Sequence, residues 1–196
     1  MRAFKHVAFL ALAGLIVAAP VRAQEREARQ AISEEAVAFF GGLCITTRGA
    51  PSRIERVIAD RQIKAVPLSP EGVQTLLDGK PGDSGWVVLT NQGAELQLLA
   101  KAPSTCTLRV LDSYGDVVNA VMADLLKGLS THDGFAFRKA MDETRSTNGG
   151  DERLVGYFLN WRDGGWSGAL SVSHIDGDGK DIPPQTFFSL EMRQTS

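Results

Sequence analysis

Strand-like runs in which apolar and polar residues alternate limit the fold of this 196-residue chain more than any other feature of its sequence. Leu96 and Leu98 lie in one such run and Cys106–Val110 forms another, and the mostly apolar run Trp86–Asn91 before them also reads as a strand. Alternation places one set of side chains on each face of a sheet, so that one face is buried and the other meets water. With a turn at Gln92-Gly93, the three runs predict an antiparallel meander.

The C-terminal part of the chain is also rich in predicted strands. A glycine-rich stretch at 163–165 indicates a hairpin between two of them, and the polar stretch 144–151 is expected to be a mobile loop. The predicted strands here are Phe135–Met141, Leu154–Trp161, Trp166–Ile175 and Phe188–Arg193.

Helical periodicity is clearest between Val118 and Leu129, where apolar residues recur at the spacing of one helix face. Ser113 and Asp116 resemble a weak capping box in front of it. Three shorter helices are expected nearer the N-terminus: one that ends at Gly41-Gly42, one after Pro51, and one capped by Ser69 that ends at Gly79.

These segments predict a single α+β domain over residues 24–196. It begins with the N-terminal helices, continues with a mainly antiparallel sheet of about six or seven strands, and has one long amphipathic helix packed on that sheet.

Residues 1–23 have the three parts of a secretory signal peptide. Arg2 and Lys5 are basic, Val7–Ala19 is an apolar run too short for a bilayer of about 30 Å, and Val21-Arg22-Ala23 ends in a small residue before Gln24. We expect cleavage after Ala23 and a mature protein in the periplasm or outside the cell, with no stable insertion into a membrane.

Cleavage would change the charge balance. The whole chain has a formal net charge of -2, and without its three signal-peptide cations it has 18 basic residues against 23 acidic ones, a net charge of -5. A nucleic-acid partner, which calls for a basic surface, is therefore not expected.

Cys44 and Cys106 are the two cysteines of the chain. An exported protein folds in an oxidising compartment, and the alternation around Cys106 points it inward, so we predict a structural disulfide between them. A reactive thiol is the alternative, although neither a C-x-x-C spacing nor a neighbouring histidine favours it.

Three motifs imitate functional sites. Gly82-Asp83-Ser84-Gly85 copies the surroundings of a serine-protease nucleophile, but the only histidine before it is His6, in the signal peptide. The stretch 165–169 is one residue short of a nucleophile elbow and lacks the following histidine. Asp176–Asp181 has some spacing of a calcium loop, but Lys180 occupies a ligand position. We interpret all three as turns or strand segments.

A possible ligand face lies near the C-terminal hairpin. Alternation places Ser167, Ser171 and Ser173 on one strand face, opposite Trp166, and Trp161 is a further aromatic candidate for a binding pocket. A solvated sheet face for the serines and core positions for the tryptophans are the alternatives.

The helix ending at Phe39-Phe40 with Cys44 after it, the tryptophan strand at Trp86, and the strand around Cys106 followed by a leucine-rich helix resemble a group of small uncharacterised exported proteins of proteobacteria. The resemblance covers roughly residues 30–130. It implies export and the pairing of Cys44 with Cys106, and it implies no activity.

We therefore expect an exported, non-catalytic binding protein for an envelope protein or a small molecule, which uses its sheet face or the stretch 144–151. No metal or cofactor is expected. A small periplasmic hydrolase with dispersed acid and base residues is the alternative. Two carboxylates, or a carboxylate and a histidine, within hydrogen-bond reach in a cleft would favour it. The candidate residues are Asp83, Asp112, Asp116, Glu152, His132 and His174.

Overall fold

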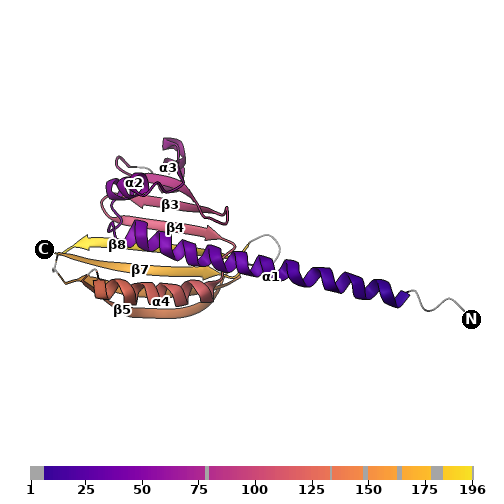
Figure 1. The fold of residues 1–196 in the computed structure, drawn as a ribbon. Helices are drawn as coiled ribbons and strands as arrows, with labels where there is room; N and C mark the ends of the chain where they lie inside the picture. Colours follow the sequence, from indigo (N-terminus) through magenta and orange to yellow (C-terminus); the bar gives the residue numbers. More distant parts are fainter. Residues whose placement is uncertain are drawn as a thin grey trace, which may run out of the picture.

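The computed structural model describes residues 7–77, 80–132, 134–147, 150–162, 165–177 and 183–195, and only the backbone of residues 7–22 and 132. Its helices are α1 (Val7–Phe39), the π-helix η1 (Phe40–Ile45), α2 (Pro51–Asp60), α3 (Pro70–Leu77) and α4 (Gly115–His132) (Figure 1). Its strands are β1 (Ala65–Pro67), β2 (Ser84–Leu89), β3 (Glu95–Lys101), β4 (Thr105–Leu111), β5 (Phe135–Thr147), β6 (Gly150–Trp161), β7 (Trp166–Ile175) and β8 (Gln185–Gln194).

The described strands form one eight-stranded sheet in the order β1-β2-β3-β4-β8-β7-β6-β5. Every neighbouring pair is antiparallel. The sheet consists of two four-stranded meanders joined where β4 pairs with β8, and α4 lies between them in the sequence. The predicted α+β class and antiparallel sheet are therefore confirmed.

The sheet has one strand more than the six or seven expected. The missed strand, β1, has only three residues and ends at Pro67, so it carries no measurable alternation. Its pairing with β2 at the sheet edge suits a proline, which has no N–H to donate to a second neighbour.

The core lies between the helices and one face of the sheet (Figure 1). Helices α1, η1, α2 and α4 contribute fully buried side chains such as Val37, Phe40, Ile54 and Met122. Figure 1 shows α1 and α4 lying across this face. The predicted packing of the amphipathic helix on the sheet is thus confirmed. No described helix is both long enough and apolar enough to cross a membrane.

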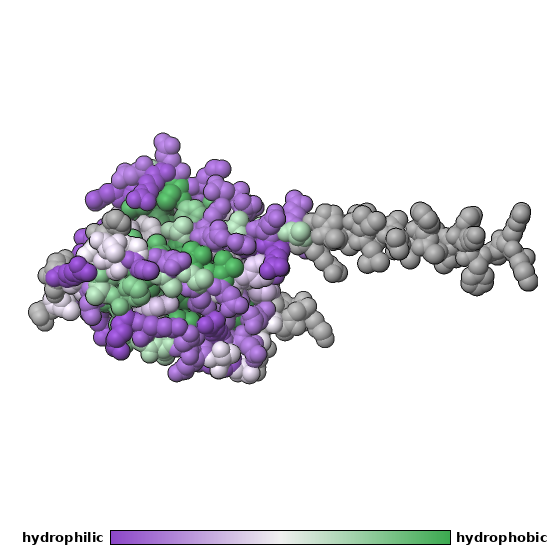
Figure 2. Space-filling model, turned by 60° about the horizontal axis from the view of Figure 1, so that its bottom comes forward, coloured by the Kyte–Doolittle hydropathy of each residue, from purple (hydrophilic) through white to green (hydrophobic). Residues whose placement is uncertain are grey.

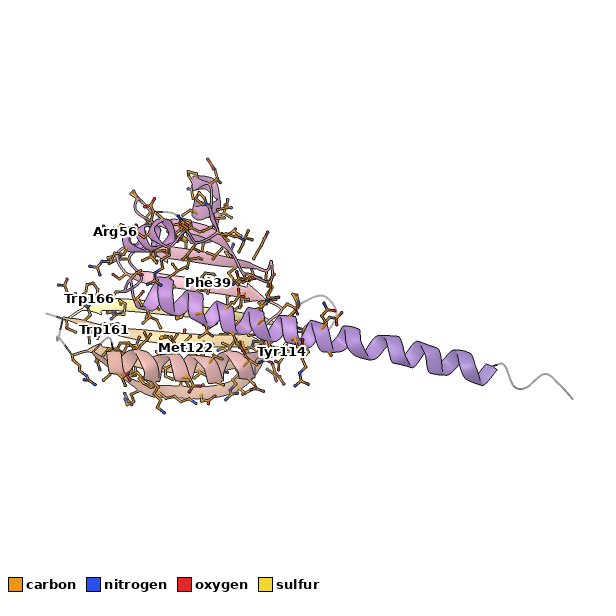
Figure 3. All side chains as sticks on the ribbon, in the orientation of Figure 1. Phe39, Arg56, Tyr114, Met122, Trp161 and Trp166 are labelled. Carbon is orange, nitrogen blue, oxygen red and sulfur yellow. A yellow bond between two sulfur atoms is a disulfide. The ribbon has the colours of Figure 1, made fainter. Side chains whose placement is uncertain are left out.

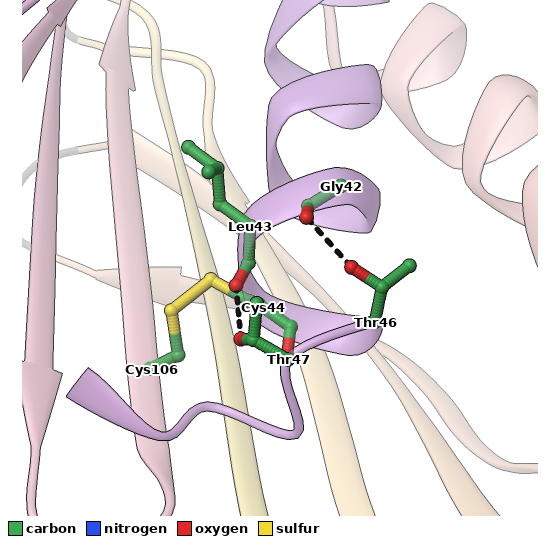
Figure 4. The surroundings of a disulfide bond; sticks show 6 residues. All are labelled: Gly42, Leu43, Cys44, Thr46, Thr47 and Cys106. Carbon is green, nitrogen blue, oxygen red and sulfur yellow. Dashed lines mark hydrogen bonds between the residues drawn. A yellow bond between two sulfur atoms is a disulfide. The ribbon is translucent and has the colours of Figure 1, made fainter. Parts of the chain in front are cut away.

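A disulfide joins Cys44 of η1 to Cys106 of β4, as predicted, and both residues are fully buried (Figure 4). The hydroxyls of Thr46 and Thr47 donate to the carbonyls of Gly42 and Leu43, one turn earlier. These bonds satisfy carbonyls where the helix ends. The bridge therefore fastens the helical layer to the middle of the sheet.

The predicted helix stop at Gly41-Gly42 is wrong. The chain continues from α1 through both glycines as η1. A Cβ built on Gly41 would lie 2.7 Å from Cδ2 of Leu125 on α4, closer than two carbon atoms can approach. Gly41 therefore permits close contact between two helices and does not end one.

The prediction of a mobile loop at 144–151 is also wrong for its described residues. β5 continues to Thr147 and β6 begins at Gly150. The stretch is polar because this end of the hairpin extends beyond the core, where it is held by backbone pairing and by cross-strand bonds. Ser146 Oγ donates to Asp151 Oδ1 at 2.8 Å, and Arg145 Nε lies 2.6 Å from Glu152 Oε2.

Candidate functional site

The sheet face opposite α1, η1, α2 and α4 is open over most of its area, and α3 contacts it at β3. Every strand residue of the buried hydrophobic core has its side chain on the sheet face that meets the helices. No strand residue with its side chain on the opposite face belongs to this core. The opposite face, here called the open face, carries side chains that stay in part accessible to solvent. Its large apolar members are Val66, Val87, Leu99, Leu111, Met141, Leu154, Phe158, Ile175 and Phe187.

The structure divides the predicted ligand residues between the two faces. Ser167, Ser171 and Ser173 lie on the open face, in register with β6 and β8 residues of the same face. Trp161 and Trp166 lie on the helical face, where the guanidinium of Arg48 stacks on both rings at 5.6 and 5.3 Å from their centroids. Figure 3 shows the two tryptophans together at one end of the sheet. The serines and the tryptophans therefore cannot form one site.

A shallow hollow of about 610 Å³ lies on the open face over β5, β6, β7 and β8. Ser167, Ala169 and Asn160 are among its lining residues, together with Phe158 and Arg193. Phe158 is 48% exposed, which is high for a phenylalanine in a paired strand. The hollow has small polar residues and a large accessible aromatic ring.

Two arginines stack on phenylalanine rings of the open face. Arg138 lies 5.3 Å from the ring centroid of Phe158, and Arg109 lies 5.4 Å from that of Phe187. Gln185 Oε1 accepts hydrogen bonds from both Nε and Nη2 of Arg109, at 3.2 and 2.9 Å. These contacts hold planar cationic groups against the sheet, and sequence analysis missed them because they depend on strand register.

A second concavity, here called the end cleft, lies between α1, the start of α4 and the ends of β5, β6 and β7, with a volume of about 710 Å³. Tyr114, at the opposite end of the sheet from the tryptophans (Figure 3), lines it. His174 and Asp176 line it too, with His174 Nε2 3.1 Å from Asp176 Oδ1. A histidine and a carboxylate thus lie within hydrogen-bond reach in a cleft, one of the two arrangements expected of the hydrolase.

His174 belongs to a chain of hydrogen bonds with a defined direction. Its Nδ1 lies 2.8 Å from Thr186 Oγ1, which lies 2.8 Å from Ser113 Oγ. Burial lowers the pKa of the imidazole below its usual value, although the Asp176 carboxylate opposes this, which favours the neutral ring. The carboxylate can only accept, so Nε2 carries the proton and Nδ1 accepts from Thr186, which accepts from Ser113.

This chain holds the structure together and offers no nucleophile. Thr186 and Ser113 are fully buried and His174 is 6% exposed, so a substrate in the end cleft cannot reach either hydroxyl. Both imidazole nitrogens already have partners. His174 lies next to the end of β7, on the buried face that it shares with Leu170, a position that the alternation could have indicated. Ser113 bonds Thr186, and the predicted capping partner Asp116 bonds Arg153.

The candidate carboxylates serve other parts of the fold. Asp83 accepts from the backbone N–H groups of Lys80 and Ala102, each at 3.0 Å, which confirms its interpretation as a turn before β2. Asp112 pairs with Arg29 at 2.7 Å. Arg145, and then Ser173, lower the pKa of Glu152 below its usual value. The geometry therefore gives each of these carboxylates a fixed cationic or N–H partner.

Within the described residues, no three His, Cys, Asp or Glu side chains are placed to hold a metal ion. Most of the calcium-like stretch, Asp178–Asp181, and the side chain of His132 lie outside the described residues.

Alanine substitutions at two glycines of α4 should change the stability of the protein in opposite directions, because only one of the two glycines contacts His174. A Cβ on Gly115 would lie 2.4 Å from Cδ2 of His174, whereas a Cβ on Gly128 meets nothing within 4 Å. We expect Gly115→Ala to lower the free energy of unfolding by about 1–3 kcal/mol, because it displaces a hydrogen-bonded buried ring. Gly128→Ala should raise it by up to about 1 kcal/mol through helix propensity. Urea unfolding of the two variants measures this difference, and equal effects of the same sign would contradict it.

Comparison with known proteins finds little. No protein-family model matches the sequence, and no curated protein matches it. A thioesterase family protein from Silicibacter pomeroyi is 10% identical with a TM-score of 0.21, covering 50% of this chain and 83% of that one. A structural genomics target is 12% identical with a TM-score of 0.16, covering 83% of this chain and 99% of that one. Likenesses at this level carry no argument about fold or function.

Proposed function

We propose that this chain is an exported, non-catalytic binding protein that presents the open face of its sheet to a protein partner of the cell envelope. The observation that carries the proposal is the one-sided core: every strand residue in it faces the helices, while Phe158, Leu111 and Met141 stay 38–48% exposed on the other side. A large exposed apolar surface interspersed with polar residues is typical of an interaction site.

The dimensions of the open face favour a protein over a small molecule. Eight strands spaced by about 4.8 Å and rising about 3.3 Å per residue give a face roughly 35 Å by roughly 20 Å. This is close to the ~800 Å² per partner of a standard protein interface. A small ligand needs a pocket that buries most of its surface, whereas the hollow beside Phe158 is shallow.

The chemistry of the open face is also that of an interface. Phe158 and Phe187, each with an arginine stacked on it, are of the residue types enriched in the cores of protein interfaces. Charges of both signs surround them, such as Arg193 with Glu191 at 2.7 Å. Export is supported by the three-part N-terminal signal and by the buried Cys44–Cys106 bond, which persists in oxidising compartments.

Photo-cross-linking in cells tests this function. A benzoyl-phenylalanine at Phe158 should give a covalent adduct with a discrete envelope protein, and one at Arg56, exposed on α2 of the helical side (Figure 3), should not. Ser171→Arg, in the middle of the open face, should reduce that adduct about tenfold or more, with Arg56→Ala as the matched control. Equal adducts from both faces, or none at Phe158, would contradict the proposal.

The hydrolase remains a second candidate because His174 and Asp176 meet in the end cleft. Asp176 is 72% exposed, so Asp176→Asn should leave the fold intact. Ester or peptide hydrolysis by the wild-type protein that disappears in this variant would favour the hydrolase over the binding function. We expect no such turnover, because the buried hydroxyls cannot act as nucleophiles.

A further inference from the structure

The two edges of the sheet differ. One edge is β1, which has three residues and ends in Pro67. The other is β5, the longest strand, with thirteen residues. In the part of the chain that the structure describes, β5 pairs with β6 alone. One full side of this long strand therefore presents unpaired backbone N–H and C=O groups, a template for another strand.

A β-bulge decides which β5 residues present these groups outward. Arg138 is opposite Phe158 and Met141 is opposite Gly156, so three steps along β5 match two along β6. Arg162 N donates to Gly134 O at 2.8 Å, so these two residues form a hydrogen-bonded pair. Hydrogen-bonded and non-hydrogen-bonded pairs alternate along antiparallel strands, so every even-numbered β6 residue is hydrogen-bonded to its β5 partner. Lys139 and Asp142, on either side of the bulge, therefore both direct their backbone groups away from β6.

This arrangement restricts how β5 can pair with a second copy of itself. Antiparallel pairing requires outward-directed residues to lie opposite one another. The outward-directed β5 residues are odd-numbered before the bulge and even-numbered after it. Only a two-fold axis through the bulge therefore places outward-directed residues opposite one another on both sides of it. That register places Lys139 opposite Asp142 of the second copy and Arg138 opposite Glu143 of the second copy.

The charges match in this register. Residues 138–143 read Arg-Lys-Ala-Met-Asp-Glu, with two cations before the bulge and two anions after it, and all are exposed. Both pairs of residues that face each other thus join opposite charges on the same face of the sheet, which stabilises strand pairing. Lys139 and Asp142 also pair within one copy, at 2.5 Å, so the Arg138–Glu143 pair distinguishes this register most directly. Figure 2, which turns the β5 side of the molecule forward, shows mainly hydrophilic side chains along the lower part of that view. Edge charges and bulges usually prevent indiscriminate pairing, and here they leave one register open.

Met141 supplies an apolar contact at the same point. It lies at the bulge on the open face, is 38% exposed, and packs over Gly156, where a Cβ would lie 2.7 Å from its Cγ. On a two-fold axis through the bulge, two such side chains meet.

We propose that two copies of this chain associate through antiparallel pairing of their β5 strands, with the two-fold axis at the bulge between Lys139 and Met141. The sheets then form one continuous surface. The open faces of both copies stay accessible and lie side by side, so the dimer would offer a partner two adjacent binding faces. This association is separate from the proposed binding function, which a monomer could perform.

Charge reversal tests the register. Sedimentation equilibrium should show a dimer of the wild-type protein at micromolar concentration. Each dimer contains two pairs in which residue 138 of one copy faces residue 143 of the other. Arg138→Glu or Glu143→Arg alone gives both pairs like charges and should weaken association about tenfold or more. The double variant Arg138→Glu/Glu143→Arg restores opposite charges and should restore the dimer. Circular dichroism of each variant verifies the fold.

A cysteine at the axis provides an independent test. Met141→Cys should form an intermolecular disulfide under mild oxidation, because the two copies meet there. Leu111→Cys, at a comparably exposed position on β4, should not. A wild-type protein that stays monomeric at about 100 µM, a double charge reversal that does not restore association, or equal cross-linking at both positions would overturn the proposal.

Discussion

Reduction of the Cys44–Cys106 bond should lower the free energy of unfolding by about 4 kcal/mol. The bond closes a loop over a sequence separation of 62 residues, and such a cross-link destabilises the unfolded chain by restricting it, to an extent that grows with the logarithm of loop length. The effect is a large fraction of the 5–15 kcal/mol typical of a domain. Unfolding in urea should therefore shift to a much lower midpoint.

The comparison is made on the wild-type chain with and without reductant, because both states keep the same two sulfur atoms in the core. Cys44→Ala/Cys106→Ala is the second measurement and adds the loss of sulfur packing. A loss below about 1 kcal/mol in the reduced protein would show that the bridge does not fasten the helical layer to the sheet as we infer.

Truncation of Phe188 to alanine should cost about 3–5 kcal/mol. Its ring stacks on that of Phe40, with centroids 5.1 Å apart, and both residues are fully buried where η1 meets β8. The change leaves a cavity between the helices and the sheet, because the surrounding side chains cannot move far enough to fill it. Phe158→Ala is the matched control, because the same substitution on the open face removes a ring that is 48% exposed. We expect that control to cost less than about 1 kcal/mol.

A double-mutant cycle with Phe40→Ala separates stacking from burial. The two rings should show a coupling energy of about 0.5–1.5 kcal/mol, the value usual for an aromatic pair. Equal losses for Phe188→Ala and Phe158→Ala would contradict the one-sided core on which the proposed function depends.

The strands with clear alternation were predictable from the sequence, and so was the inward position of Cys106. The loop prediction at 144–151 was wrong because its polar side chains indicate exposure to solvent, and exposed residues can also lie in a regular strand. Gly41 was misread because its function depends on Leu125, far away in the sequence. The buried position of His174 was not predicted, although alternation along β7 places it on the same face as Leu170.

The candidate site was less predictable than the fold. Alternation correctly placed Ser167, Ser171 and Ser173 on one face, because that property belongs to a single strand. Alternation also placed Trp166 on the opposite face, whereas Trp161 was added by residue type alone and lies on the helical face with Trp166. The arginine–phenylalanine pairs join neighbouring strands, so register had to be known first.

The sequence alone determined which side chains share a face of each strand or helix, since 2.0- and 3.6-residue periods are local properties of the backbone. It also predicted the cysteine pairing from compartment and number. Only the tertiary structure decided which sheet face the helices cover, that β5 is an edge strand, and that His174 is held by Thr186 and Ser113. These depend on strand order and register, which arise from contacts between residues distant in the chain, and no local pattern encodes them.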